Sequence, residues 1–127
     1  MTYAFFVLLR ATPAWLRLSR DERRRQAEQH LSGALSASPG VRIRHFDAEA
    51  FSGICSDVLL VEATDPQQHY FFIERLRDTP LINQPYFEVV HIIPAIEDGY
   101  RAFEEKEGLD GREGREGLDG ASSPARR

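Results

Sequence analysis

Histidine and acidic residues concentrate in one short stretch, residues 45–62, which links two apolar runs of β-strand character. His45, Asp47, Glu49 and Asp57 lie in it. A neutral histidine accepts a proton near neutral pH, and a neighbouring carboxylate can orient the ring or stabilise the charge that it gains. His45 with Asp47 or Asp57 is therefore a candidate catalytic group for proton transfer.

A second candidate base lies on a later strand-like run. The alternation of side chains along a strand predicts that His91 shares a face with Phe87 and Val89, an apolar setting like that of His45. Both histidines also have a structural interpretation as hydrogen-bonded core groups. Asp47 and Asp57 also have a structural interpretation, because aspartates in strand connections commonly accept hydrogen bonds from nearby backbone amides.

Aromatic and basic residues are the candidates for binding a substrate. Trp15, Tyr70 and Tyr86 would line an apolar pocket, although such rings also serve ordinary core packing. Arg10 at the end of the first strand would hold a carboxylate, unless it forms a surface ion pair. Cys55 has no evident base beside it in the sequence, which favours a buried structural role over a nucleophile.

The sequence predicts no metal and no cofactor. Its four histidines and one cysteine lack the recurrent spacing of a metal site. We find no nucleotide-binding loop, nucleophile elbow or redox pair. The chemistry would therefore rest on the side chains alone.

Composition narrows the range of partners. The net charge is −4, from 16 basic and 20 acidic residues, which argues against binding nucleic acid or an anionic membrane surface. No apolar run approaches the roughly 18 residues needed to cross a bilayer. The single cysteine excludes an internal disulfide, and the N-terminus lacks a signal-peptide pattern, so we expect a cytoplasmic protein.

The periodicity of apolar residues predicts six elements. Ser19 and Asp65 have the form of helix N-caps, and Pro94 should close the last strand. Strands and helices are expected in the order β-α-β-β-α-β, over residues 3–9, 20–37, 41–46, 58–61, 66–77 and 87–93. This order is typical of an α+β ferredoxin-like fold with a four-stranded antiparallel sheet.

The sequence divides into a folded domain and a tail. Residues 1–103 contain nearly all of the apolar residues and form the predicted domain. Residues 104–127 are charged and rich in glycine, with a short repeat at 107–111 and 116–120, and we expect them to be disordered. Two helices cover only one sheet face, and strand 3–9 is apolar on both sides, so we expect a homodimer that covers the second face.

Several motifs of this chain resemble those of the darcynin family of small bacterial proteins. They are ATPAWL at 11–16, FDAEAFS at 46–52, CSD at 55–57, PYFEVV at 85–90 and IIPAIEDGY at 92–100. The resemblance implies a dimeric α+β barrel. That group contains cofactor-independent monooxygenases, small isomerases and cyclases of aromatic metabolism, and proteins without known activity.

Two functions remain open at this point. The first is a homodimeric enzyme that acts on a small aromatic or polyketide-like metabolite by proton transfer, cyclisation or oxygenation. The second is a non-catalytic dimer that binds a small ligand or a partner protein. The sequence contains no sharp catalytic motif that would decide between them.

Overall fold

A four-stranded antiparallel sheet forms the framework of the unit Met1–Glu97 in the computed structural model, which describes residues 1–109. The strand order is β2-β3-β1-β4, so β2 and β4 are the edges. The strands are β1 (Tyr3–Ala11), β2 (Arg42–Asp47), β3 (Asp57–Ala63) and β4 (Phe87–Ile96). The sequence-based prediction of an α+β ferredoxin-like fold is confirmed.

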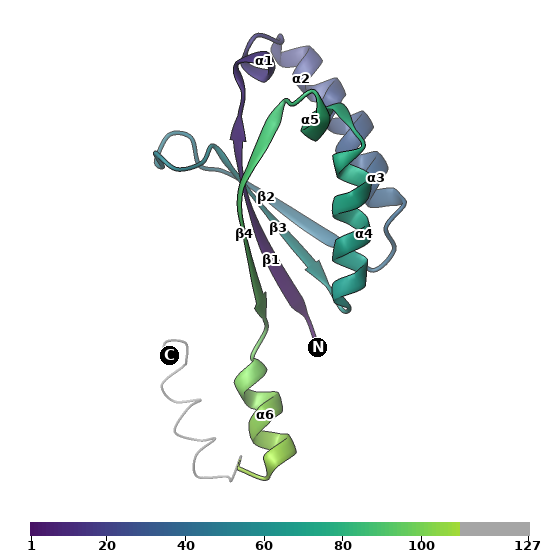
Figure 1. Cartoon of the computed structure of the whole chain (residues 1–127), viewed down its shortest axis with the longest axis vertical. Coiled ribbons are helices and arrows are strands. Elements are labelled where there is room, and N and C mark those ends of the chain that lie inside the picture. Colours follow the sequence, from purple (N-terminus) through teal and green to yellow (C-terminus); the bar gives the residue numbers. More distant parts are fainter. Residues whose placement is uncertain (110–127) are drawn as a thin grey trace. The chain divides into compact units, whose positions relative to one another are not determined.

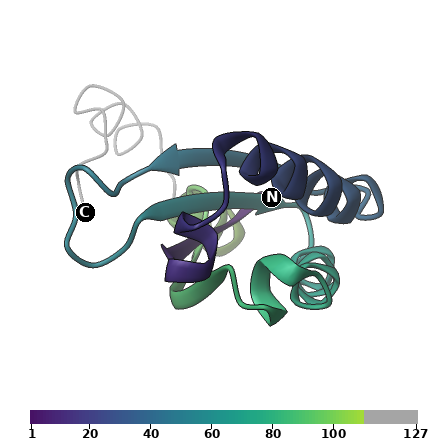
Figure 2. The same cartoon turned by 90° about the horizontal axis from the view of Figure 1, so that it is seen from above.

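Helices lie along one face of this sheet (Figures 1 and 2). The helical segment over residues 20–36 is continuous and contains a π-helical turn, and two short helices, at residues 13–16 and 80–83, were not predicted. The helices are α1 (Pro13–Leu16), α2 (Arg20–Gln26), η1 (Ala27–Leu31), α3 (Ser32–Ser36), α4 (Pro66–Arg77) and α5 (Pro80–Asn83). The other face of the sheet has no helix of this unit against it (Figure 1).

Local sequence signals explain where the long helices begin. Ser19 Oγ accepts a hydrogen bond from the amide of Glu22 at 3.1 Å, and Asp65 Oδ1 accepts from the amide of Gln67 at 2.8 Å. Both predicted N-caps are therefore confirmed, since each satisfies an amide that has no partner within its helix.

The core lies between the sheet and the helices. Phe72 of α4 is fully buried, and Leu76 one turn later is nearly so. They pack in one apolar cluster with Val7, Leu59 and Val61 of the sheet. Phe72 and Leu76 recur at helical spacing, which puts both on the inward face of α4.

His69 is a titratable residue within that inward face. Its ring stacks on Phe5 with 3.7 Å between centroids, and among the described residues nothing bonds to its Nδ1. Desolvation by burial lowers the pKa of His69 from 6.5 to about 4. The folded protein therefore resists protonation of this ring.

This burial makes stability depend on pH. As the pH falls from about 6.5 toward 4, the unfolded chain takes up a proton at His69 that the folded chain does not, so folding weakens. Between pH 7 and pH 5, we expect His69→Phe to lose about 1–2 kcal/mol less of its free energy of unfolding than the wild type loses. Urea unfolding at both pH values measures this difference. The control His30→Gln should lose as much stability between pH 7 and pH 5 as the wild type. An equal loss in His69→Phe and the wild type would contradict the assignment.

A β-bulge in β4 changes which residues share a face. Leu8 of β1 lies opposite His91, whereas Leu9 lies opposite Val89, so Val90 is the extra residue. His91 consequently lies on the uncovered face of the sheet while Val89 lies on the covered face. The prediction that both residues share a face is wrong, because strict alternation holds only without a bulge.

β4 also runs further than expected. We predicted that Pro94 closes the strand, but β4 continues to Ile96, with Pro94 opposite Phe5 of β1. A proline can occupy an edge strand because its missing N–H faces away from the neighbouring strand. The position of β4 at the sheet edge therefore explains the difference.

A second unit begins at Asp98 and contains α6 (Gly99–Glu107). This helix includes residues 104–107, which the sequence analysis assigns to the tail. Good helix-forming residues support it, and Gly108 ends it in the left-handed conformation at φ +72°. The rest of the predicted tail, residues 110–127, lies outside the described residues. No helix within residues 1–109 is long and apolar enough to cross a membrane.

Candidate functional site

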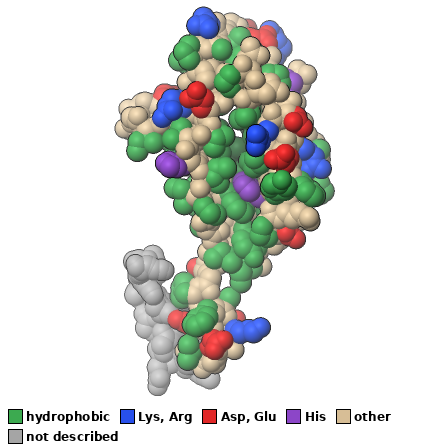
Figure 3. Space-filling model, in the orientation of Figure 1, with side chains coloured by type: hydrophobic (Ala, Val, Ile, Leu, Met, Phe, Trp, Pro, Cys, Tyr) green, Lys and Arg blue, Asp and Glu red, His purple; other side chains and the backbone are tan. Residues whose placement is uncertain are grey.

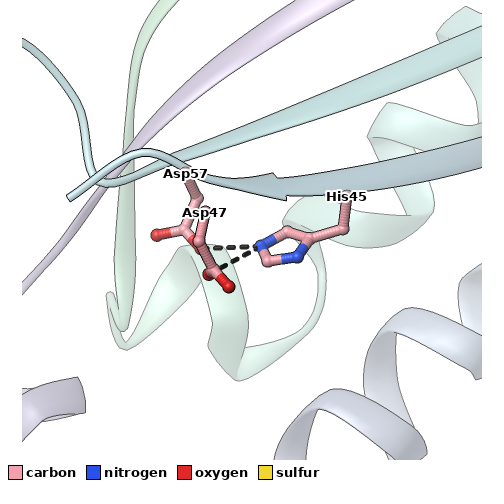
Figure 4. A group of neighbouring side chains, drawn as sticks. All are labelled: His45, Asp47 and Asp57. Carbon is pink, nitrogen blue, oxygen red and sulfur yellow. Dashed lines mark hydrogen bonds and ion pairs between the residues drawn. The ribbon is translucent and has the colours of Figure 1, made fainter. Parts of the chain in front are cut away.

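The end of β2 and the start of β3 lie side by side and bring the acid–base candidates together. In the ladder, His45 lies opposite the buried Leu59, and Asp47 lies opposite Asp57. All four side chains thus lie on the helix-covered face. His45 Nε2 is 2.7 Å from Asp57 Oδ2 and 3.8 Å from Asp47 Oδ1 (Figure 4). The sequence offered Asp47 or Asp57 as the partner of His45, and both lie near its ring, with Asp57 the nearer.

The hydrogen bond to Asp57 orients the imidazole. When Asp57 is ionised its carboxylate only accepts, so in that state Nε2 donates the hydrogen bond and Nδ1 of a neutral ring keeps its lone pair. The side chain of His45 is 46% exposed, whereas that of Asp57 is 15% exposed. The carboxylate is therefore the fixed partner and the imidazole the accessible one. A proton gained at Nδ1 would leave a cation with two carboxylates within 4 Å.

Ser56 holds the second oxygen of Asp57. Its hydroxyl donates to Asp57 Oδ1 at 2.6 Å and accepts from the amide of Ala11 at 2.8 Å. Its own amide donates to the carbonyl of Leu9 at 2.8 Å, which ties the start of β3 to β1. Ser56 was not among the site residues predicted from the sequence. Its place directly before Asp57 in the CSD motif was the available signal.

A cavity of about 400 Å³ lies between the sheet and the helices, and His45, Asp47 and Asp57 form one end of it. The rest of its wall is apolar and comes from the sheet, α1, η1, α4 and α5. These residues are Leu9, Trp15, Ala27, Leu31, Leu59, Leu76, Leu81, Ile82 and Phe87. The site thus combines a polar end with an apolar body, as small-molecule sites commonly do.

Trp15 is the aromatic wall of this cavity. Its ring centroid is 4.7 Å from that of Phe87 and 5.5 Å from that of Tyr86, so Tyr86 supports the indole without lining the cavity itself. Thr12 positions the short helix that carries Trp15. Its hydroxyl donates to the carbonyl of Pro85 at 2.8 Å and accepts from the amide of Trp15 at 3.3 Å.

Three predicted site residues lie elsewhere. His91 is on the uncovered sheet face because of the bulge in β4. Arg10 is on that face too, where its guanidinium donates to the carbonyl of Ile54 at 3.0 Å and lies 3.6 Å from Glu88. Tyr70 is 60% exposed, since it follows the inward-facing His69 by one residue and helical rotation turns it outward.

The polar end of the cavity also meets the distance requirement for a metal ion. One ligand atom from each of His45, Asp47 and Asp57 lies within 4.8 Å of the others. The sequence spacing did not predict this grouping, because the ligands come from two strands. Histidine and carboxylate groups are ligands for divalent transition metals, yet such exposed groups are common without one. Proximity alone therefore assigns no metal here.

The fold and the site define a ferredoxin-like α+β protein with a His–Asp pair at the polar end of an apolar cavity. The fold is similar to that of chlorite dismutase from Candidatus Nitrospira defluvii in complex with imidazole, with a TM-score of 0.63 and 13% identity. That match covers 73% of this chain and 38% of the other. A mutant of that protein gives a TM-score of 0.64 at 14% identity, over 84% of this chain and 46% of the other. This chain thus spans less than half the length of either.

The chain belongs to the darcynin family. The family model, described as Darcynin, domain of unknown function, matches residues 2–110. Darcynin from Chromobacterium violaceum is 54% identical over 66 residues, which is 52% of this chain and 84% of the relative. Darcynin 1 from Acinetobacter baumannii is 44% identical over 87 residues, which is 68% of this chain and 97% of the relative. The resemblance seen in the sequence motifs is confirmed.

Proposed function

We propose that this protein is an enzyme that moves a proton on a small aromatic or polyketide-like metabolite. The observation that carries the proposal is the 2.7 Å bond between His45 and Asp57 at the polar end of the apolar cavity. His45 is the general base, Asp57 is its positioning partner and Trp15 packs against the substrate ring. The proposal uses His45 rather than His91, because His91 lies on the other sheet face.

The proposed step begins with a substrate ketone in the cavity. Nδ1 of His45 removes a proton from the carbon beside the carbonyl, the C–H electron pair forms the enolate, and the imidazole becomes a cation. Asp57 and Asp47 stabilise this cation. The apolar wall excludes water from the enolate, which then takes a proton back from the imidazolium. The step is an isomerisation when the proton returns at another carbon.

Proton exchange tests this proposal without knowledge of the natural substrate. 2-Tetralone is an aromatic ketone with acidic methylene protons, and in D₂O their NMR signal disappears as deuterium replaces them. We expect the protein to accelerate this loss at least tenfold over buffer, in the presence and absence of EDTA. Binding of 2-tetralone without acceleration would instead favour the non-catalytic ligand-binding alternative. Loss of the acceleration with EDTA would overturn the side-chain mechanism.

We also propose that two copies of the chain pair through the uncovered sheet face. Apolar residues from all four strands lie on this face, where no helix of the Met1–Glu97 unit covers them. They are Ala4, Phe6, Leu8, Phe46, Val58, Leu60, Ile93 and Ala95. Exposed apolar faces of this kind are typical of subunit interfaces, and identical copies pair by twofold symmetry.

A charge placed on this face tests the dimer. Ile93 is 52% exposed and lies opposite Phe6, so Ile93→Arg would bury an unpaired charge in a dimer interface. We expect the dissociation constant from sedimentation equilibrium to rise at least tenfold. Phe71→Arg, at an exposed apolar residue of α4 on the helical side, is the matched control and should leave dimerisation unchanged. A wild-type monomer at micromolar concentration would contradict the proposal.

A further inference from the structure

A second cavity, of about 450 Å³, lies in the same layer between sheet and helices, on the side of β4. Its wall is almost wholly apolar, and Arg77 and Glu88 are its charged residues. The apolar residues that belong to it and not to the first cavity include Val7, Ile73, Val89 and Ile92. Figure 3 shows hydrophobic side chains mixed with charged ones over this part of the molecule, so the apolar wall is defined by the residues that line the cavity. Neither the acid–base site nor the dimer uses this cavity.

The two cavities share part of their walls. Leu9, Leu76, Ile82 and Phe87 line both of them, so one layer of side chains separates the two spaces. Leu9 and Leu76 are buried in the core, whereas Ile82 and Phe87 are only partly buried and pack at its margin. The partition is therefore least constrained at Ile82 and Phe87, the two shared side chains with the most room to change rotamer.

We infer that the two cavities together bind one elongated ligand, a hydroxyl-bearing ring with an apolar chain. The ring occupies the first cavity with its hydroxyl at His45, and the chain passes Ile82 and Phe87 into the second cavity. The inference rests on the proposed function, because it uses the same polar end of the first cavity. It adds the substrate class, since a compact ring alone would leave the second cavity unused.

Charge at the polar end selects the head group. Asp47 and Asp57 place two carboxylates there, and Nδ1 of His45 has an available lone pair. A ligand carboxylate would be repelled by the aspartates, whereas a hydroxyl donates a hydrogen bond to Nδ1 or to a carboxylate oxygen. A phenol, which has the shape of the enol of a cyclic ketone, is therefore the appropriate probe.

A series of 4-alkylphenols tests the inference by titration calorimetry. We expect wild-type affinity to rise about two- to fourfold per methylene from 4-ethylphenol through 4-butylphenol to 4-hexylphenol, as the chain enters apolar surroundings. Val89 lines only the second cavity and is partly exposed, so Val89→Phe should fill that cavity without unfolding the protein. In this variant the gain with chain length should disappear while 4-ethylphenol binds as before. Val89→Ala is the matched control and should keep the gain.

Each outcome bears on a different part of the inference. A wild-type protein that binds 4-ethylphenol but gains nothing with chain length would overturn the two-cavity inference and leave the acid–base site intact. Failure of every phenol to bind would contradict both proposals. We expect 4-hexylbenzoate to bind at least tenfold more weakly than 4-hexylphenol, and equal affinity would contradict the head-group assignment.

Discussion

Replacement of His45 by glutamine is expected to slow the exchange of 2-tetralone protons by about 100-fold, to near the rate in buffer alone. Glutamine keeps a polar side chain of similar reach but has no lone pair basic enough to remove a proton from carbon, and general bases typically contribute factors of about 10²–10⁴. The side chain is 46% exposed, so the folded structure should tolerate the change. Proton NMR in D₂O measures the rate.

Two companion variants separate catalysis from position. Asp57→Asn should lower the exchange rate about tenfold and change its pH profile, because the amide can present a donor to Nε2 and so favour the wrong tautomer. His91→Gln should leave the rate unchanged, since His91 lies on the opposite sheet face. A loss of exchange in His91→Gln with normal exchange in His45→Gln would transfer the role of base to His91.

Truncation of Phe72 to alanine is expected to give the largest loss of stability. The side chain is 0% exposed and packs in the cluster that joins α4 to the sheet. Removing a buried phenylalanine costs about 3–5 kcal/mol, from lost transfer free energy and the cavity left behind. Urea or thermal unfolding at neutral pH measures the change in the free energy of unfolding.

The neighbouring residue supplies the control for this variant. Phe71 lies on the same helix but is 45% exposed, so Phe71→Ala should cost less than about 1 kcal/mol. Similar losses for the two variants would contradict the assignment of Phe72 to the core. Phe72→Leu should recover part of the loss, because it leaves a smaller cavity.

The structural predictions succeeded where a local rule governs the outcome. Ser19 and Asp65 cap helices because a side-chain oxygen must satisfy amides that the helix leaves without partners. His69, Phe72 and Leu76 face inward because they recur at the period of one helix. His45, Asp47 and Asp57 were candidates because their types could do acid–base chemistry and they lie close together in the sequence.

Predictions failed where a non-local or irregular feature intervened. The bulge at Val90 puts His91 on the other sheet face, and no residue type in strand β4 predicts a bulge there. Pro94 stayed within β4 because that strand is at the sheet edge, which depends on strand order. Tyr70 points outward for a local reason, because it follows the inward-facing His69 by one residue of the helix.

The sequence by itself determined the order of the four strands and the two long helical segments, the starts of those segments and the family, because these depend on periodicity, capping chemistry and motifs. Only the tertiary structure decided which aspartate bonds to His45, since that choice depends on the register of β2 against β3. It also decided that Ser56 fixes Asp57 and that two apolar cavities adjoin at Ile82 and Phe87. Register, bulges and the space left between packed side chains arise from contacts between distant segments, which no local pattern encodes.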